Sequence, residues 1–188
     1  PGTALERAWA SLPVRRDAPP SLRFAAESAV VELLAAGSGR SPTEVLGQGR
    51  STVQVNALIT NPVMDGARKA RQYREQGYRA VKVKVGRGAM GQEIDALRQI
   101  RDVLGEEVAL RADANRAWSL EETVIFAEET ADLRLAYVEE PLAEPSRLSA
   151  LTARTDLPVA LDETTREVGL EVLGAEGSVA ALVLKPTL

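Results

Sequence analysis

The chain of 188 residues contains neither cysteine nor histidine. The absence of cysteine excludes disulfide bonds and metal sites built from thiolates. The absence of histidine leaves carboxylates, lysines and tyrosines as the groups available for acid–base chemistry. Any bound metal ion must therefore accept oxygen ligands.

Charge and long apolar runs are also limited. The chain has 27 acidic and 23 basic side chains, a net charge of −4, and no basic stripe that would indicate a nucleic-acid partner. It has no apolar run long enough to span a bilayer and no secretion signal at its start. We therefore expect a cytoplasmic globular protein that acts on a small molecule, with no nucleic-acid or membrane partner. The oligomeric state is left open.

From about residue 51 the sequence repeats a short strand followed by an amphipathic helix. Asn61–Pro62 is typical of a helix start, and Ser119 with Glu122 and Thr164 with Glu167 are spaced as capping boxes. Such alternation indicates a parallel α/β architecture, either a (β/α) barrel or a doubly wound sheet. The predicted strands are Val53–Ile59, Ala80–Val85, Val108–Ala114, Leu135–Glu139, Val159–Asp162 and Ala180–Leu184.

The first 50 residues follow a different pattern. Ser21–Ala36 is predicted to be a helix with Leu22 and Leu33 on its apolar face. We expect residues 1–50 to be the end of a preceding domain with a connecting helix, and residues 51–188 to form the barrel. A closed barrel needs eight strands and typically about 250 residues. Six strands therefore indicate a partial barrel.

Ionisable residues stand at the end of each predicted strand from the second to the sixth. Because parallel strands present their carboxyl ends at one edge, these side chains are expected to converge there, where α/β enzymes carry out their chemistry. In strand order they are Lys82 and Lys84, Asp113, Glu139 and Glu140, Asp162 and Glu163, and Lys185.

Three converging carboxylates repel one another unless a cation joins them. All-oxygen ligation favours Mg²⁺, with Mn²⁺ possible. Asp113, Glu139 and Asp162 are the predicted ligands, and Glu140 and Glu163 are assigned supporting positions beside them. An ammonium beside the metal and a second lysine is expected to have a lowered pKa, which suits a base.

Each of these residues also has an ordinary explanation. Lys82 and Lys84 alone fit a solvated strand face, and a single strand-end acid is most often a helix cap. Lys185 fits a loop lysine. The joint order of lysine, three acids and lysine over five consecutive strands is what favours one site.

The motifs KVKVG, RADANRAWS, YVEEPL, ALDET and LVLKPTL, in this order, resemble the barrel of the enolase superfamily. The paired lysines are similar to its muconate-lactonizing subgroup. VNALI, Arg111-x-Asp113-x-Asn115 and LKPTL are most similar to o-succinylbenzoate synthases. FAAESAVVELLA resembles the helix that closes the family's N-terminal α+β capping domain, so residues 1–50 would be its remnant.

The resemblance implies a metal-dependent carbon–oxygen lyase of menaquinone biosynthesis. It would dehydrate 2-succinyl-6-hydroxy-2,4-cyclohexadiene-1-carboxylate to o-succinylbenzoate. Asp113, Glu139 and Asp162 match the family's metal ligands, and a lysine base with Mg²⁺ is its known arrangement. By position, Lys84 matches the lysine that removes the α-proton and Lys185 the lysine that stabilises the enolate. Lys82, Arg111 and Asn115 match flanking polar supports.

Two other functions remain open. An N-acylamino acid racemase or dipeptide epimerase of the same superfamily would use the same two lysines, although Arg111 and LKPTL favour the synthase. A non-catalytic α/β domain that binds a structural cation is the alternative from another class.

Overall fold

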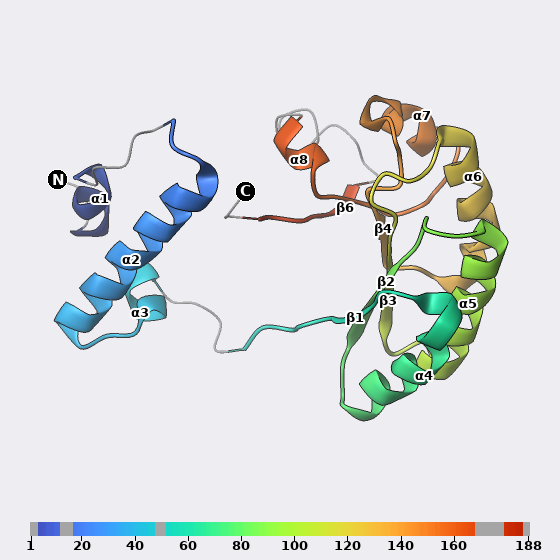
Figure 1. The fold of residues 1–188 in the computed structure, drawn as a ribbon, viewed down its shortest axis with the longest axis horizontal. Helices are drawn as coiled ribbons and strands as arrows, with labels where there is room; N and C mark the ends of the chain where they lie inside the picture. Colours follow the sequence, from blue (N-terminus) through green and yellow to red (C-terminus); the bar gives the residue numbers. More distant parts are fainter. Residues whose placement is uncertain (1–3, 12–16, 48–51, 168–178, 186–188) are drawn as a thin grey trace. The chain divides into compact units, whose positions relative to one another are not determined.

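The computed structural model describes residues 4–11, 17–47, 52–167 and 179–185 of the chain (Figure 1). Its internal contacts divide the chain into two units. One comprises Pro1–Val53 with Lys185–Leu188, and the other comprises Gln54–Leu184. None of the described helices is long and apolar enough to cross a membrane.

The first unit is helical where it is described. The helix predicted at Ser21–Ala36 is confirmed as α2, which ends at Gly39 in the left-handed conformation with a φ of 66°. Its buried residues are Val31 and Ala35, whereas Leu22 and Leu33 of the predicted apolar face are exposed. That this unit is the end of a capping domain stays a prediction. Its helices are α1 (Ala4–Ala10), α2 (Pro20–Ser38) and α3 (Pro42–Leu46).

The second unit is a six-stranded parallel sheet in which every strand pairs with its neighbour along the chain. A doubly wound sheet reverses its strand order at a switch point, whereas a (β/α) barrel keeps sequence order. The order therefore confirms the partial barrel. The strands are β1 (Ala57–Ile59), β2 (Ala80–Lys84), β3 (Ala109–Asp113), β4 (Tyr137–Glu139), β5 (Val159–Leu161) and β6 (Val179–Leu182).

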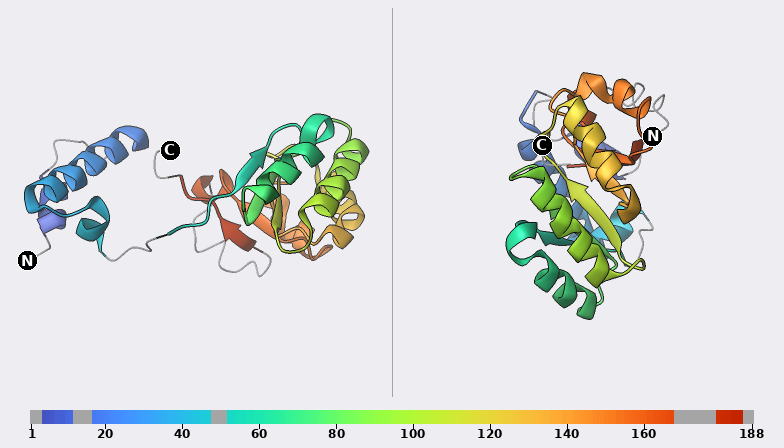
Figure 2. Two further views of the ribbon diagram at one scale, coloured as in Figure 1. Left: turned by 90° about the horizontal axis from the view of Figure 1, so that it is seen from below. Right: turned by 90° about the vertical axis from the view of Figure 1, so that its right-hand side faces the viewer.

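Helices follow the strands, and α4, α5 and α6 lie along the same side of the sheet (Figures 1 and 2). Asn61 caps the first of them by accepting a hydrogen bond from Met64 N, and Ser119 and Glu122 form the predicted capping box. The elements are α4 (Pro62–Glu75), α5 (Met90–Leu104), α6 (Leu120–Glu129), the 3₁₀ turns η1 (Ala131–Leu133) and η2 (Pro145–Arg147), α7 (Leu148–Thr152) and α8 (Thr164–Glu167).

Strand β2 shows how the sequence pattern sorts side chains between the two faces. Val81 and Val83 are completely buried in the core that the helices cover, together with Leu97 of α5. Because successive side chains of a strand point to opposite faces, Lys82 and Lys84 lie on the face away from these helices. The two lysines therefore share the inner face of the partial barrel.

The first predicted strand is longer than the observed one. Only Ala57–Ile59 pairs with β2, and Val53 and Val55 are exposed. A β-branched pattern forms a strand only where a partner lies in register, and no described strand pairs with these two residues. The other strand predictions agree with the structure within two residues at each end.

Candidate active site

Sheet register brings the first four predicted site residues together. Lys84 is paired with Asp113 of β3, Asp113 with Glu139 of β4, and Lys82 with Arg111. Asp162 follows the end of β5, two residues after Ala160, the register partner of Glu139. The ends of β2 to β5 thus carry a continuous row of ionisable side chains.

The two lysines hold the first two carboxylates by direct ion pairs. Lys82 Nζ lies 3.1 Å from Asp113 Oδ2 and 3.0 Å from Glu139 Oε2. Lys84 Nζ donates to Asp113 Oδ2 and to Asn115 Oδ1, each at 2.7 Å. Asp113 and Glu139 are almost fully buried, whereas both ammonium groups keep some exposure. An approaching ligand can therefore reach the lysines.

Burial and charge set the ionisation of this cluster. Burial raises the pKa of Glu139, the Asp113 and Asp162 charges add to the rise, and Lys82 opposes it. Burial would also raise the pKa of Asp113, but hydrogen bonds from Lys84 and Lys82 outweigh it and lower that pKa. Burial alone would lower the pKa of Lys82, yet the bonds and charges of Glu139 and Asp113 raise it. Lys82 therefore stays protonated.

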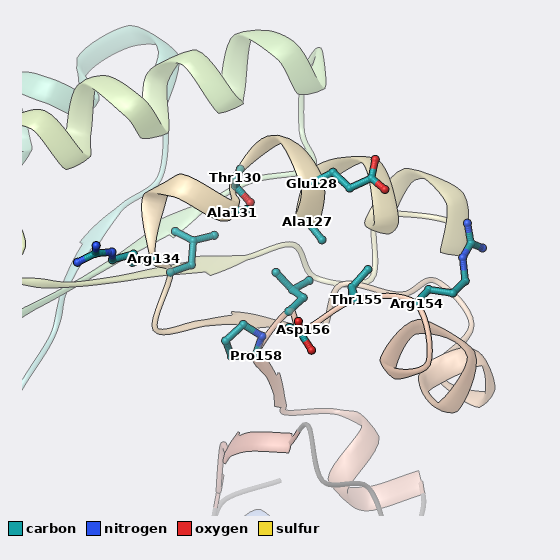
Figure 3. A pocket seen from close by; sticks show the side chains of 11 residues that line it. Ala127, Glu128, Thr130, Ala131, Arg134, Arg154, Thr155, Asp156 and Pro158 are labelled. Atoms are coloured by element: carbon teal, nitrogen blue, oxygen red, sulfur yellow. The ribbon is translucent and has the colours of Figure 1, made fainter.

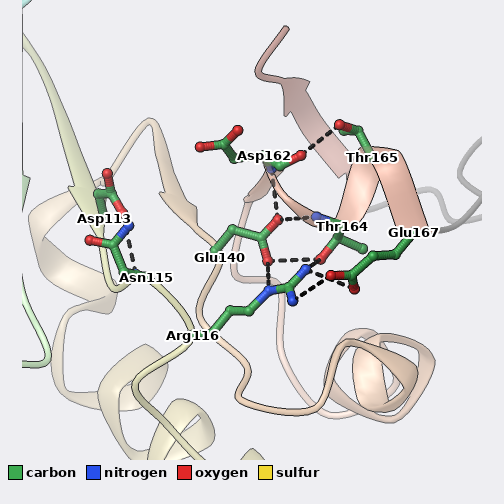
Figure 4. Close-up of polar contacts among 8 residues, drawn as sticks. All are labelled: Asp113, Asn115, Arg116, Glu140, Asp162, Thr164, Thr165 and Glu167. Atoms are coloured by element: carbon green, nitrogen blue, oxygen red, sulfur yellow. Dashed lines mark hydrogen bonds and ion pairs between the residues drawn. The ribbon is translucent and has the colours of Figure 1, made fainter. Parts of the chain in front are cut away.

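Glu140, directly after β4, is hydrogen-bonded to the turn after β5 that carries Asp162, shown with Asp113 and Asn115 in Figure 4. Both carboxylates are buried, at 4% and 2% exposure. Glu140 Oε1 accepts hydrogen bonds from the backbone N–H of Asp162 at 2.7 Å and of Thr164 at 2.8 Å. Glu140 thus supports the segment that carries the third predicted ligand.

The capping box predicted for Thr164 and Glu167 is wrong. Thr164 lies within α8, and its hydroxyl donates to Glu140 Oε2 at 2.8 Å. Glu167 instead pairs with Arg116, which the sequence analysis missed. The spacing matched a local capping motif, but both side chains have partners from distant parts of the chain. An arginine directly after the Asp-x-Asn motif was the only available signal.

Arg111 lies on the same inner face, beside Lys82 on the neighbouring strand. Its guanidinium donates to Asn56 Oδ1 and lies over the Tyr137 ring, with 5.0 Å between Cζ and the ring centroid. Its buried Nε has no hydrogen-bond partner. The arrangement holds Arg111 in the lumen near Lys82, its register partner.

Glu163 and Lys185 are the two remaining predicted residues. Glu163 is half-buried in the turn before α8, where its carbonyl accepts from Arg166 N. Lys185 is exposed and belongs to the first unit by its contacts, so its approach to the carboxylates stays a prediction.

A cavity of about 440 Å³ lies at the opposite edge of the sheet (Figure 3). Leu135 and Pro158, which line it, precede β4 and β5, so it adjoins the amino ends of the strands. None of the predicted site residues lines it. The chemistry-bearing row and this cavity are therefore separate features.

Comparison with known proteins identifies the family. Residues 65–186 match the enolase C-terminal domain-like family, a match that includes β2 to β6 and the row of ionisable residues. The chain belongs to this family. Among its relatives, the chain is 32% identical over 160 residues to the L-Ala-D/L-Glu epimerase of Bacillus subtilis, which covers 81% of this chain and 44% of the epimerase.

A second relative has another activity than the epimerase. The o-succinylbenzoate synthase of Thermobifida fusca is 33% identical over 142 residues, covering 73% of this chain and 44% of the synthase. A dipeptide epimerase structure from Enterococcus faecalis V583, complexed with Mg and the dipeptide L-Leu-L-Tyr, aligns with a TM-score of 0.76 and 25% identity. The alignment covers 90% of this chain and 49% of that one. The chain spans less than half the length of these relatives.

The predicted ligands fit a hard divalent ion by their chemistry. Asp113, Glu139 and Asp162 are buried carboxylates at adjacent strand ends. Burial raises the pKa of Glu139, and the negative charges of Asp113 and Asp162 raise it further. In the described ranges, no group of three or more acidic side chains already stands in metal-binding geometry. Lys82 instead bridges Asp113 and Glu139.

Proposed function

We propose that this chain carries the catalytic face of an o-succinylbenzoate synthase, a metal-dependent carbon–oxygen lyase. The contact of Lys84 Nζ with Asp113 Oδ2 and Asn115 Oδ1 carries the proposal. It puts an amine beside the carboxylate row, at the end of the strand where substrate can approach. The Asp113 side chain is only 1% exposed, so Lys84 is bonded to a buried carboxylate, as a lysine on a solvated strand face would not be.

The proposed metal ion is Mg²⁺, held by Asp113, Glu139 and Asp162, and Mn²⁺ has suitable chemistry too. When bound, it would supply positive charge to the substrate carboxylate and to the enolate that forms from it. Lys82 holds Asp113 and Glu139 in place. The Lys82 ammonium favours the ionised form of both carboxylates, whereas their burial opposes it.

Lys84 is the proposed proton carrier. As a free amine it takes the proton from the carbon next to the substrate carboxylate, and the electron pair of that C–H bond moves into the enolate. The enolate then collapses, the C–O bond to the hydroxyl group breaks, and Lys84 returns its proton to the leaving hydroxide as water. The dehydrated ring is o-succinylbenzoate, and its aromaticity favours completion. Lys185 is proposed to stabilise the enolate from the opposite side.

The Arg111-x-Asp113-x-Asn115 motif supports a synthase over an epimerase, because it resembles that of the o-succinylbenzoate synthases. The Arg111 side chain is half-buried on the inner face near Lys82, where its guanidinium bonds Asn56 and lies over the Tyr137 ring. Racemisation or epimerisation remains the second candidate, because 32% identity to the epimerase of Bacillus subtilis extends over 160 residues. In that reaction Lys84 and Lys185 would exchange protons at opposite faces of one carbon.

The deciding experiment uses the whole protein with Mg²⁺ and measures o-succinylbenzoate formation beside racemisation of N-succinyl amino acids. Lys84→Ala is expected to abolish dehydration, whereas Lys69→Ala is the matched control, because Lys69 pairs with Asp65 on α4 far from the row. Near-normal dehydration by Lys84→Ala would contradict the mechanism. Racemisation without dehydration would favour the epimerase class, and metal binding with neither reaction would favour a cation-binding domain.

A further inference from the structure

Glu140 is a buried acceptor that receives four hydrogen bonds. Its Oε1 accepts from the backbone N–H groups of Asp162 and Thr164. Its Oε2 accepts from the Thr164 hydroxyl at 2.8 Å and from Arg116 Nε at 3.0 Å (Figure 4). One carboxylate therefore fixes the backbone on both sides of Glu163.

Arg116 is the cation that faces this carboxylate. Its Nη1 and Nη2 lie 2.8 Å and 3.0 Å from the two carboxylate oxygens of Glu167, and Nη2 donates to Thr164 Oγ1 at 2.9 Å. The Thr164 hydroxyl therefore accepts from Arg116 while it donates to Glu140. One guanidinium joins the loop after β3, the end of β4 and the first turn of α8.

The two carboxylates bonded to Arg116 differ in exposure, and this gives them different roles. Glu140 is 2% exposed and Glu167 is 54% exposed. A buried carboxylate without a cation is costly, whereas an exposed one is solvated by water. The bond from Arg116 to Glu140 therefore compensates a buried charge and stabilises the loop, whereas the bond to the exposed Glu167 contributes little.

The backbone also commits Arg116 to this position. Asn115, Arg116 and Glu140 all have left-handed φ angles, of 48°, 62° and 43°. Such conformations persist in non-glycine residues only where the surroundings hold them. Arg116 N donates to Glu140 O at 2.7 Å, so main chain and side chain bind the same residue. The loop after β3 is thus fixed to the loop after β4 at this point.

We propose that Arg116 is a positioning residue for the Asp162 carboxylate. The inference rests on the proposed metal-dependent function and deepens it. By holding Glu140, Arg116 fixes the N–H groups of Asp162 and Thr164, and so fixes the direction in which the Asp162 side chain leaves the backbone. Arg116 itself touches neither the proposed metal nor the substrate.

Metal binding provides the first test. Mn²⁺ binding, with no other ligand present, is measured from the decrease in the electron paramagnetic resonance signal of the free ion. The proteins compared are wild type, Arg116→Met, Arg116→Lys and the control Arg154→Met. Arg154 makes a similar two-bonded pair with Glu121, but on an exposed surface. The dissociation constant is expected to rise about tenfold in Arg116→Met, as for other residues that orient metal ligands. It is expected to stay within twofold of wild type in Arg154→Met.

Arg116→Lys separates charge from geometry, and it carries the test if Arg116→Met does not fold. Lysine keeps the positive charge but cannot bond Glu140 and Thr164 together as a planar fork. A several-fold loss of Mn²⁺ affinity is expected. Glu167→Gln is expected to bind Mn²⁺ as wild type does, because the bond from Arg116 to Glu140 remains.

Hydrogen exchange of the metal-free protein provides a readout independent of metal. The amides of Asp162 and Thr164 are expected to exchange at least about tenfold faster in Arg116→Lys and unchanged in Arg154→Met. If wild type binds no Mn²⁺, the proposed metal function fails, and this exchange still decides the positioning role. Unchanged exchange at these two amides, or equal loss of Mn²⁺ affinity in Arg154→Met, would overturn the proposal.

Discussion

Gly86 lies so close to Ala117 that a β-carbon on Gly86 would stand 2.4 Å from the Cβ of Ala117. Gly86 lies two residues after Lys84, the last residue of β2, and its φ of 76° is left-handed. The contact joins the loop after the lysine strand to the loop after β3. The two loops that flank Lys84 and Asn115 are therefore packed together.

Gly86→Ala is expected to lower the free energy of unfolding by at least about 2 kcal/mol, because the new methyl group both clashes and strains the backbone. Urea unfolding measures the change. Gly91→Ala is the matched control: Gly91 lies in α5 with open space around it, so alanine there is expected to be neutral or stabilising by up to about 1 kcal/mol. Equal destabilisation by both substitutions would contradict the packing argument.

Glu93→Gln should destabilise the same loop. The buried Glu93 carboxylate accepts hydrogen bonds from the backbone N–H groups of Gly86, Arg87 and Gly88, at 2.7, 3.0 and 3.1 Å. A glutamine loses the charge and turns an N–H group toward donors. A loss of about 2 kcal/mol in unfolding free energy is expected. Glu106→Gln, in an exposed pair with Arg134, is expected to change it by less than about 0.5 kcal/mol.

Asp113→Asn and Glu139→Gln are expected to weaken Mn²⁺ binding at least about tenfold, because each removes a charged oxygen from the proposed ligand set. Calorimetric titration of the whole protein measures the dissociation constants. Glu106→Gln serves as the control with an exposed carboxylate. Wild-type affinity in both site variants would place the ion elsewhere and remove the metal from the proposed mechanism.

The Ser119–Glu122 capping box makes a prediction about pH. Hydrogen bonds from the backbone N–H and then the hydroxyl of Ser119 lower the pKa of Glu122, so the box stabilises the fold above the ordinary glutamate pKa of 4.5. Its contribution is lost as the pH falls through the lowered folded-state pKa. Ser119→Ala is expected to raise the Glu122 titration midpoint toward 4.5, as followed by NMR.

Glu44 supplies an internal reference for this titration. Its pKa is lowered by Ser41 in a second capping box of α3. The Glu44 midpoint is expected to be unchanged by Ser119→Ala. A Glu122 midpoint that stays in place while the hydroxyl is absent would show that the backbone N–H alone lowers the pKa.

Some predictions from the sequence succeeded because they depend on local or periodic features. Alternation of Val81, Lys82, Val83 and Lys84 assigned the two faces of β2 without any tertiary information. The Ser119 box depends on residues three apart. Parallel strands of similar spacing then placed Asp113 and Glu139 at a common edge, and the register confirmed that they are neighbours.

Other predictions failed because their outcome depends on partners that are distant in sequence. Val53 and Val55 have strand-like side chains, but no described strand pairs with them. Thr164 and Glu167 have the spacing of a local cap, yet their side chains bond residues 24 and 51 positions away in the sequence. A local sequence pattern cannot predict such distant partners.

The sequence by itself determined the chemistry available at the strand ends: three lysines, five acids, and no histidine or cysteine. It also determined the alternating strands and helices, because periodicity and capping are properties of neighbouring residues. Only the tertiary structure decided that Lys82 bridges Asp113 and Glu139, and that Arg116 reaches Glu140. These contacts follow from strand register and left-handed loop backbones, which bring together residues 24 to 57 positions apart.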